Sequence, residues 1–462
     1  MSELGLLASI LISSSAGSAL GFATGLVPGL HVNNVAAATV AYAGTVLAFF
    51  ALVGDIVGSD DCSIMVSCFL VSALVSHCFS EAVPNTYVGI PSGDAITVLP
   101  AHRLARAGLG WTAVKASVDG NIAGVLLGVG ALLPVSFVLG PSVGLYESIR
   151  TVMGYLIILL SSLLVLSDGL AVPASRHRTF LKVKRTSKVL AVFAASGVLG
   201  LVVLDTNYFA CAMPGCQNPF VPRSSLLLPL FAGLFGLPTL LLSIVGSQAR
   251  APVLTCACKV RSSNGAMSTV LSLAGGVLVG WIPGLTSGSS ATLCSSILRQ
   301  PAEEASDVEG SMRFIWLYSA ISTAGAVLSV GALFTILRSR SGVMDAVTRF
   351  VPPEPVSASV SDMLAPAAIL LSMVLSALLS CIIMVNMRER LRRVGMVLCL
   401  RSLAIGAVLF ICSLVAALTG LRGVFLLATA CSLGVMPPLI GVRRIHLMGC
   451  LLVPISLMFV SW

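Results

Sequence analysis

Apolar stretches as long as a membrane-spanning helix recur along the whole chain. Of its 462 residues 57% are hydrophobic and only 10% are charged, whereas soluble domains carry about 25% charged residues. A bilayer admits only helices and closed barrels, and a spanning helix needs about 20 apolar residues. Such runs lie near residues 4–24, 35–53, 62–83, 112–138, 151–174, 187–204, 223–246, 266–282, 289–299, 313–337, 361–387, 394–419, 423–440 and 445–461. The sequence therefore predicts an all-α integral membrane protein with about 10–14 membrane segments.

The charged residues indicate a multi-pass protein of the cell membrane. The formal charge of +9 is concentrated in a few loops, which fits contact with anionic lipid headgroups and argues against nucleic-acid binding. Residues 1–12 lack the basic leader of a cleaved signal peptide, so we expect them to belong to the mature protein.

The thirteen cysteines favour packing over chemistry. Most of them stand alone in apolar runs, where a thiol behaves as a small hydrophobic group. Cys211 and Cys216 flank a Pro-Gly turn and could form a disulfide if their loop is extracytoplasmic. Cys256 and Cys258 lack a second pair at zinc-binding spacing, so no metal site is expected.

Basic loops predict the orientation of the chain. Lysines and arginines are densest at 176–188 and 388–393, which places both segments in the cytoplasm by the positive-inside rule. Counting outward, the remaining loops alternate consistently only if residues 4–53 and 266–299 each enter and leave on one side. These two segments are therefore predicted to be re-entrant or broken helical hairpins, the first opening outward and the second inward.

The two predicted hairpins share a motif. Residues 25–36, GLVPGLHVNNVA, align without gaps on residues 280–291, GWIPGLTSGSSA, with five of twelve positions identical. Related motifs in opposite orientation are typical of inverted-topology repeats, which bind substrate near the membrane midplane between discontinuous helices. We therefore divide the chain into repeat 1 at 1–174, connector spans with a basic cytoplasmic loop at 175–264, and repeat 2 at 265–462.

Each Pro-Gly interruption is a candidate anion site. Glycine permits a turn, and the new half-helix points its unpaired N–H groups and positive dipole end at the gap. For one copy a proline kink with a packing glycine would be favoured; two aligned copies favour binding. His31 could also be structural, and Asn33 and Asn34 could cap the next helix. The candidate substrate-binding residues are Pro28, Gly29, His31, Asn33, Asn34, Pro283, Gly284, Thr286, Ser287, Ser289 and Ser290.

Residues 80–121 supply further polar candidates. Glu81 and Asp94 are candidates for coupling to a proton or sodium ion, and Asp119 with Asn121 forms an intramembrane polar pair. The basic group of His102, Arg103 and Arg106 could meet an anionic head group. The alternative is an interfacial loop with helix caps, which we favour for any single residue here. The segment 338–342, RSRSG, could pair with substrate charge, but snorkelling to the interface is the favoured interpretation.

Motifs of common enzymes are absent from the sequence. It contains no Walker loop, HExxH, GxSxG or dinucleotide fingerprint. The protein is therefore expected not to be an enzyme and to need no cofactor beyond a possible coupling proton or sodium ion.

The chain resembles the TctA-like superfamily, the large membrane subunit of tripartite tricarboxylate transporters, and especially its archaeal members. The resembling stretches are GLVPGLHVNN, IPSGDAITVLPAHRLARAGLG, GWIPGLTSGSS, FIWLYSAISTAGAV and RSRSGVMDAV. The resemblance implies uptake of a small carboxylate with a small membrane subunit and an extracytoplasmic binding protein. Related bacterial polyprenyl-phosphate translocases imply the alternative of flipping a lipid-linked phosphate.

Together these observations predict a secondary transporter. An anionic group, a carboxylate or a lipid phosphate, would bind between the two broken hairpins while one repeat moves against the other. A lipid-carrier flippase is the alternative. A non-transporting membrane scaffold is a further alternative, which would leave the repeated breaks unexplained.

Overall fold

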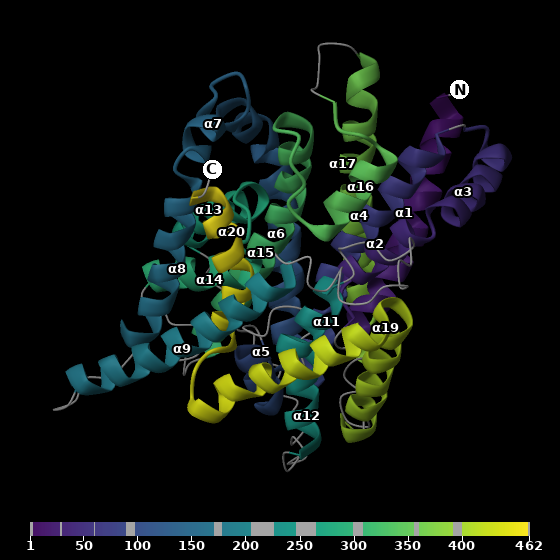
Figure 1. The fold of residues 1–462 in the computed structure, drawn as a ribbon. Coiled ribbons are helices and arrows are strands. Elements are labelled where there is room, and N and C mark those ends of the chain that lie inside the picture. The colour runs from purple at the N-terminus through teal and green to yellow at the C-terminus, as the bar shows by residue number, and fades with distance from the viewer. Residues whose placement is uncertain are drawn as a thin grey trace.

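The protein folds into a bundle of helices (Figure 1). The computed structural model describes residues 3–27, 30–59, 61–88, 98–170, 178–204, 226–245, 265–298, 308–354, 360–390 and 400–460. Every regular element among them is a helix, which confirms the predicted all-α integral membrane protein.

Seven helices of the described part are long and apolar enough to span a membrane. They are α1 (Glu3–Leu26), α4 (Cys62–Ser80), α6 (Gly110–Leu139), α9 (Arg178–Leu204), α15 (Val308–Thr335), α17 (Val360–Asn386) and α19 (Leu400–Ile440). The pair α2 (Val32–Ala41) and α3 (Ala43–Val57), bent by 91°, could supply an eighth span.

Shorter elements complete the fold. They are η1 (Pro84–Val88), α5 (Val98–Arg106), α7 (Leu145–Arg150), α8 (Met153–Leu170), α11 (Leu227–Phe231), η4 (Ala232–Gly236), α12 (Leu237–Val245), α13 (Ala266–Trp281), α14 (Ser287–Ile297), α16 (Gly342–Phe350), η5 (Arg444–Met448) and α20 (Gly449–Val460).

Two expected boundaries differ from the structure. The basic segment expected to be a loop at 176–188 is helical from Arg178 onward, because lysine and arginine are good helix formers and α9 continues past its apolar part. The runs expected at 394–419 and 423–440 are joined in α19, which is interrupted by Gly420 at a φ of 64°. Positive φ suits glycine, so the chain changes direction there without a separate loop.

Small residues hold the central helices close together. A Cβ on Gly17 or Gly21 would collide with the backbone of α4, and one on Gly120 or Gly124 would collide with α15. Close helix approach through small residues is typical of membrane bundles, where van der Waals contact replaces hydrophobic exclusion. Hydrogen bonds between hydroxyl groups also connect these helices. For example, the Oγ atoms of Ser117 and Ser319 are 2.8 Å apart.

The central packing has the two-part pattern that the repeated motif predicts. Helix α1 packs on α4 as α13 packs on α15, and α17 packs on α4 as α6 packs on α15. Gly276 lies against Ala324 and Gly280 against Leu328, so α13 and α15 run parallel; α1 and α4 do the same. In Figure 1 the α1–α4 part lies to the right of the α13–α15 part.

The corresponding helices α4 and α15 run in opposite directions. Cys78 of α4 approaches Ser322 of α15, with Sγ and Oγ 3.7 Å apart. Further along α4, Glu81 shares a cavity with Tyr318, which lies earlier in α15. An inverted repeat requires this antiparallel arrangement. The repeat boundaries at 174 and 264 and the membrane orientation stay predictions.

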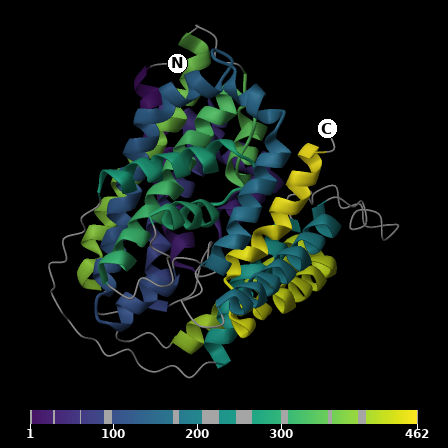
Figure 2. The ribbon, with the colours of Figure 1, turned by 90° about the vertical axis from the view of Figure 1, so that its left-hand side faces the viewer.

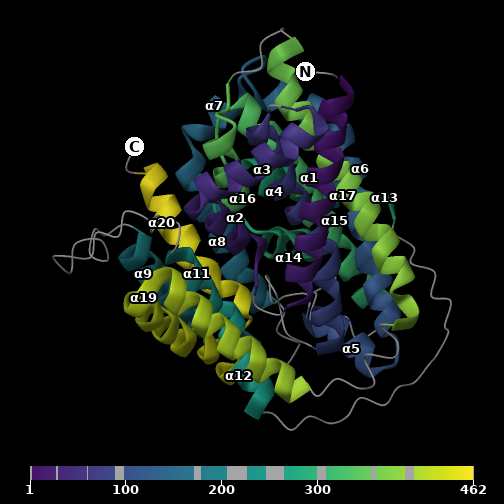
Figure 3. The ribbon, with the colours of Figure 1, turned by 90° about the vertical axis from the view of Figure 1, so that its right-hand side faces the viewer.

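A second layer covers one flank of the bundle. Helices α11, α12 and α19 pack together, and α9 packs on α8 and α20. Figures 2 and 3 show this group beside the central helices. It contains α9, α11 and α12 from the predicted connector as well as α19 and α20 from the chain end.

Candidate functional site

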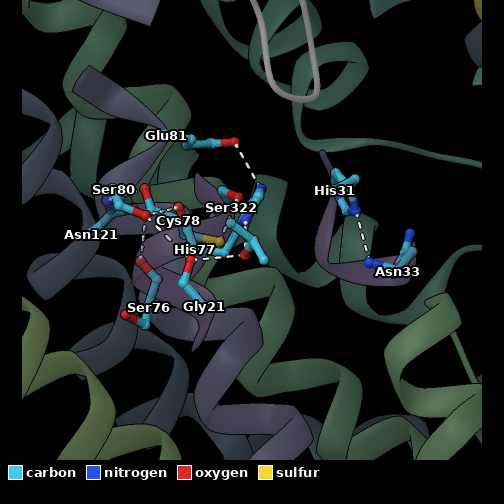
Figure 4. Close-up of polar contacts among 11 residues, drawn as sticks. Gly21, His31, Asn33, Ser76, His77, Cys78, Ser80, Glu81, Asn121 and Ser322 are labelled. Atoms are coloured by element: carbon cyan, nitrogen blue, oxygen red, sulfur yellow. Dashed lines mark hydrogen bonds and ion pairs between the residues drawn. The ribbon is translucent and has the colours of Figure 1, made fainter. Parts of the chain in front are cut away.

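The first helix break lies between α1 and α2. Helix α1 ends at Leu26 and α2 begins at Val32, while Pro28 and Gly29 lie outside the described residues. His31 has an extended backbone and is the N-cap of α2, because its Nδ1 accepts a hydrogen bond of 3.1 Å from the N–H of Asn33 (Figure 4). The sequence offered Asn33 and Asn34 as caps; the structure assigns that role to His31.

The second helix break lies between α13 and α14. Its turn contains Pro283, and Gly284 adopts a φ of 80°, a left-handed conformation that side chains disfavour. Thr286 is the N-cap of α14, and its Oγ1 accepts a hydrogen bond of 3.3 Å from the N–H of Ser289. The motif alignment places Thr286 opposite His31, and each of the two residues is the N-cap of the half-helix that follows its break.

Buried hydroxyls fasten the second hairpin. Ser290 is fully buried and donates to the carbonyl of Gly275 at 3.1 Å, which ties α14 to α13. Ser289 is also fully buried, with its Oγ 3.2 Å from that of Thr286. Ser287 is half-buried. These serine hydroxyls therefore fix the shape of the hairpin. The N-cap Thr286 marks the start of α14 beside them.

A buried histidine that sequence reasoning missed adjoins the first break. The ring of His77 lies 5.3 Å from that of His31, centroid to centroid. His77 Nε2 lies 3.9 Å from Glu81 Oε2, one helical turn along α4, and His77 and Glu81 are 1% and 7% exposed. Their four-residue spacing was the available signal, since such residues share a helix face.

The hydroxyl of Thr24 lies beside the ring of His77. The single hydroxyl hydrogen of Thr24 goes to the carbonyl of Gly21 at 2.9 Å. Thr24 Oγ1 also lies 3.1 Å from His77 Nδ1, so one side of the imidazole faces α1 and the other, Nε2, faces Glu81. Imidazole and carboxyl groups are the two side chains here that can bind or release a proton.

Glu81 also lines a small cavity between the two halves. Its size suits about one water molecule. The cavity is polar on several sides: its lining residues are Glu81, Ala82, Asn85, Thr86, Ala101, Ser117, Ile315, Tyr318 and Ser319. Beside it, the buried Asn121 donates to the carbonyl of Cys78 at 2.9 Å (Figure 4). The cavity lies between Glu81, which directly follows α4, and residues of α15.

The remaining candidates occupy varied places. His102 Nδ1 lies 3.1 Å from the carbonyl of Thr86, near that cavity, whereas Arg103 is exposed. Asp119 is exposed and pairs with Lys115 one turn away on α6, so it does not share the buried position of Asn121. Asp94 and the side chain of Arg106 lie outside the described residues, as do Cys211 and Cys216. No group of three metal-binding side chains occurs in the described part.

The helical bundle and its two discontinuous helices define a polytopic membrane protein with a paired internal architecture. The sequence profile of the tripartite tricarboxylate transporter TctA family matches residues 11–449. The chain belongs to this family and is a membrane permease of the tricarboxylate-transporter type. The resemblance inferred from the motifs is thereby confirmed.

Other comparisons add an uncharacterized relative. The chain is 24% identical over 329 residues to an uncharacterized protein of Methanocaldococcus jannaschii, covering 71% of this chain and 69% of the relative. No solved structure matches the chain.

Proposed function

We propose that the protein is a secondary transporter that binds an anionic group at the N-terminal ends of α2 and α14. One observation carries this proposal: both half-helices begin at aligned breaks, have neutral N-caps and lack an acidic residue in the first turn. The positive ends of their dipoles are therefore not neutralised by their own sequence. By contrast, α15 and α16 carry Glu309 and Asp345 in their first turns.

Small carboxylates are the favoured substrates. The family's function supports a tricarboxylate or related acid, and membership in the family implies a small membrane subunit and an extracytoplasmic binding protein as partners. Hydroxyl and backbone N–H donors suit carboxylate and phosphate oxygens alike. Flipping of a polyprenyl phosphate therefore stays the alternative, in which membrane lipid itself supplies the anionic group.

Alternating access would follow from the paired packing. In an inverted repeat, one half rocks against the other around a central site. The contact between Cys78 and Ser322 and the cavity beside Glu81 lie where the α4 and α15 halves meet. Movement at this junction would alter the surroundings of His31, His77 and Glu81.

Coupling to protons is the favoured source of energy. His77 Nε2 and Glu81 Oε2, 3.9 Å apart, are buried next to the N-cap of α2, so a proton bound by either group would be buried there too. Ionisable residues inside a membrane are costly and commonly mark proton pathways. Protonation here would add positive charge beside the anion site, so proton binding and anion binding would favour each other.

Reconstitution tests the proposed function. Purified protein in liposomes is assayed for uptake of radiolabelled citrate and, separately, for translocation of a short-chain polyprenyl phosphate. We expect one of these activities, with loss in His31→Ala and Ser289→Ala. Lys115→Ala, which alters an exposed pair on α6, is the matched control. If both variants transport like the wild type, the two breaks are not the site.

A further inference from the structure

An arginine between α15 and α16 has neighbours that contact both helix breaks. Arg340 follows the end of α15 and directly precedes Ser341, the N-cap of α16. Two residues later, Gly342 packs on the first motif: a Cβ there would lie 3.1 Å from Cγ and Oδ1 of Asn33. Figure 1 shows α16 beside α2 and α4, and α16 packs on both helices.

The same arginine reaches toward the second motif. Arg340 Nη2 donates a hydrogen bond of 2.6 Å to the hydroxyl of Tyr146 on α7, and its guanidinium lies 5.4 Å from the centre of that ring. The Tyr146 ring in turn lies 6.3 Å from the ring of Trp281, the last residue of α13 before the second break. Arg340 is therefore connected to Trp281 through the side chain of Tyr146 and to Asn33 through the backbone that leads to Gly342.

Two buried donors in this group lack partners among the described residues. They are Nε of Arg340 and Nε1 of Trp281. None of the salt bridges in the described part includes Arg340. A buried donor without an acceptor costs free energy, and an unpaired charge costs more. Both residues that carry these donors contact Tyr146, and a ligand with several oxygen acceptors would satisfy such donors.

The neighbouring residues argue against simple snorkelling to the interface. Arg338, two positions earlier, is exposed, as a snorkelling arginine should be. Arg340 is half-buried against a buried tyrosine. Asp345, the acidic residue in the first turn of α16, is exposed and accepts a hydrogen bond of 3.5 Å from Ser339.

We infer that Arg340 binds the carboxylate or phosphate group of the transported substrate, with Trp281 as a second donor and Tyr146 as a positioning residue. This inference rests on the proposed function, because it names the charged group that the half-helix ends lack. A guanidinium can engage two oxygens of either anion at once, which a lysine cannot do. Its place between the motifs would let one anion contact both halves.

Equilibrium binding to the purified protein tests the inference, with radiolabelled citrate and a short-chain polyprenyl phosphate as separate probes. For the probe that the wild type binds, we expect Arg340→Gln to raise Kd by about 10- to 100-fold, the range for losing a charged hydrogen bond. Arg340→Lys should restore part of this loss, and Trp281→Phe should show a smaller loss. Arg338→Gln is the matched control and should bind within about twofold of the wild type.

The outcomes separate this inference from the proposed function. Wild-type affinity in Arg340→Gln would overturn the inference but would not contradict the proposed transport function. A wild type that binds neither probe would instead refute the proposed function. Tyr146→Phe removes the hydroxyl but keeps the ring; if it weakens binding as much as Arg340→Gln, the arginine acts through the fold. Failure of both Arg340 variants to fold would likewise assign it a structural role and overturn the inference.

Discussion

The break between α1 and α2 and the break between α13 and α14 share a backbone design but differ in chemistry. In each, a helix ends, the chain turns and a new helix begins. The N-cap side chain of the new helix accepts a hydrogen bond from the backbone N–H two residues later at the first break and three residues later at the second. The first break adjoins the titratable side chains of His31, His77 and Glu81. The second is lined by the hydroxyls of Thr286 and Ser290, which stay neutral at any physiological pH.

This difference suggests that the two breaks have different roles in transport. On the proposed function, the two breaks would each offer a helix N-terminus to an anion, and only one of them would need a titratable group for coupling. The neutral copy would then bind independently of pH, while the first copy would respond to it. The comparison can be tested at three levels, from transport to packing to capping.

The largest effect should come from removing the titratable carboxyl group of Glu81. Glu81→Gln cannot exchange a proton, so the carrier should still equilibrate substrate but should no longer accumulate it. With the membrane potential clamped at zero, one pH unit can support about a tenfold gradient per coupled proton, and the variant should fall to equal concentrations. Uptake driven by an imposed pH gradient, compared with substrate exchange, measures this effect.

The control for the coupling experiment is Asp119→Asn. Asp119 is exposed and pairs with Lys115, so this variant should accumulate substrate normally. Unchanged accumulation in Glu81→Gln would contradict proton coupling at the first break.

An intermediate effect should come from overpacking the two aligned glycines. A Cβ on Gly25 would collide with Ser80 Oγ and lie 2.8 Å from the carbonyl of His77, whereas one on Gly280 would lie 2.9 Å from Leu328 Cβ. Gly25→Ala should therefore destabilise more than Gly280→Ala, within the range of about 1–3 kcal/mol for overpacking. Thermal unfolding of the purified protein compares them.

Gly130→Ala is the matched control for packing, because Gly130 lies within α6 and a Cβ there meets nothing within 4 Å. It should be neutral or slightly stabilising, since alanine is the better helix former. Equal losses in all three variants would mean that close helix approach does not distinguish the two breaks.

The smallest effect should come from the caps. Thr286→Ala removes the oxygen that accepts from Ser289 and should cost about 1 kcal/mol, whereas Thr286→Ser should retain most of the stability. At the first break, His31→Asn should keep the cap but lose the imidazole. The midpoint of thermal unfolding measures all three; a loss in Thr286→Ser equal to that in Thr286→Ala would exclude capping by the hydroxyl.

Much of the fold could be predicted from local patterns. Runs of apolar residues located the spans because each helix satisfies its own backbone within the bilayer. The paired Pro-Gly motifs located both helix interruptions because proline and glycine act on their own segment of backbone. Aligning the motifs also placed His31 opposite Thr286, which the structure shows to be equivalent caps.

The site was predictable only in part. Glu81 was a candidate from its charge alone, but its partner His77 lay within an apolar run and its significance required the ring of His31 from another helix. Asp119 and Asn121 looked alike in sequence, yet one faces outward and the other is buried. Positions two apart on a helix point about 200° apart, so these two residues face nearly opposite sides of α6.

The sequence by itself determined that this chain is a helical membrane protein of the TctA family with two related helix breaks, because hydropathy, proline and glycine act locally. Only the tertiary structure decided that α4 and α15 run antiparallel, that His77 adjoins His31 and Glu81, and that Arg340 lies between the motifs. Those relations join residues up to hundreds of positions apart, and close packing of several helices at once selects them.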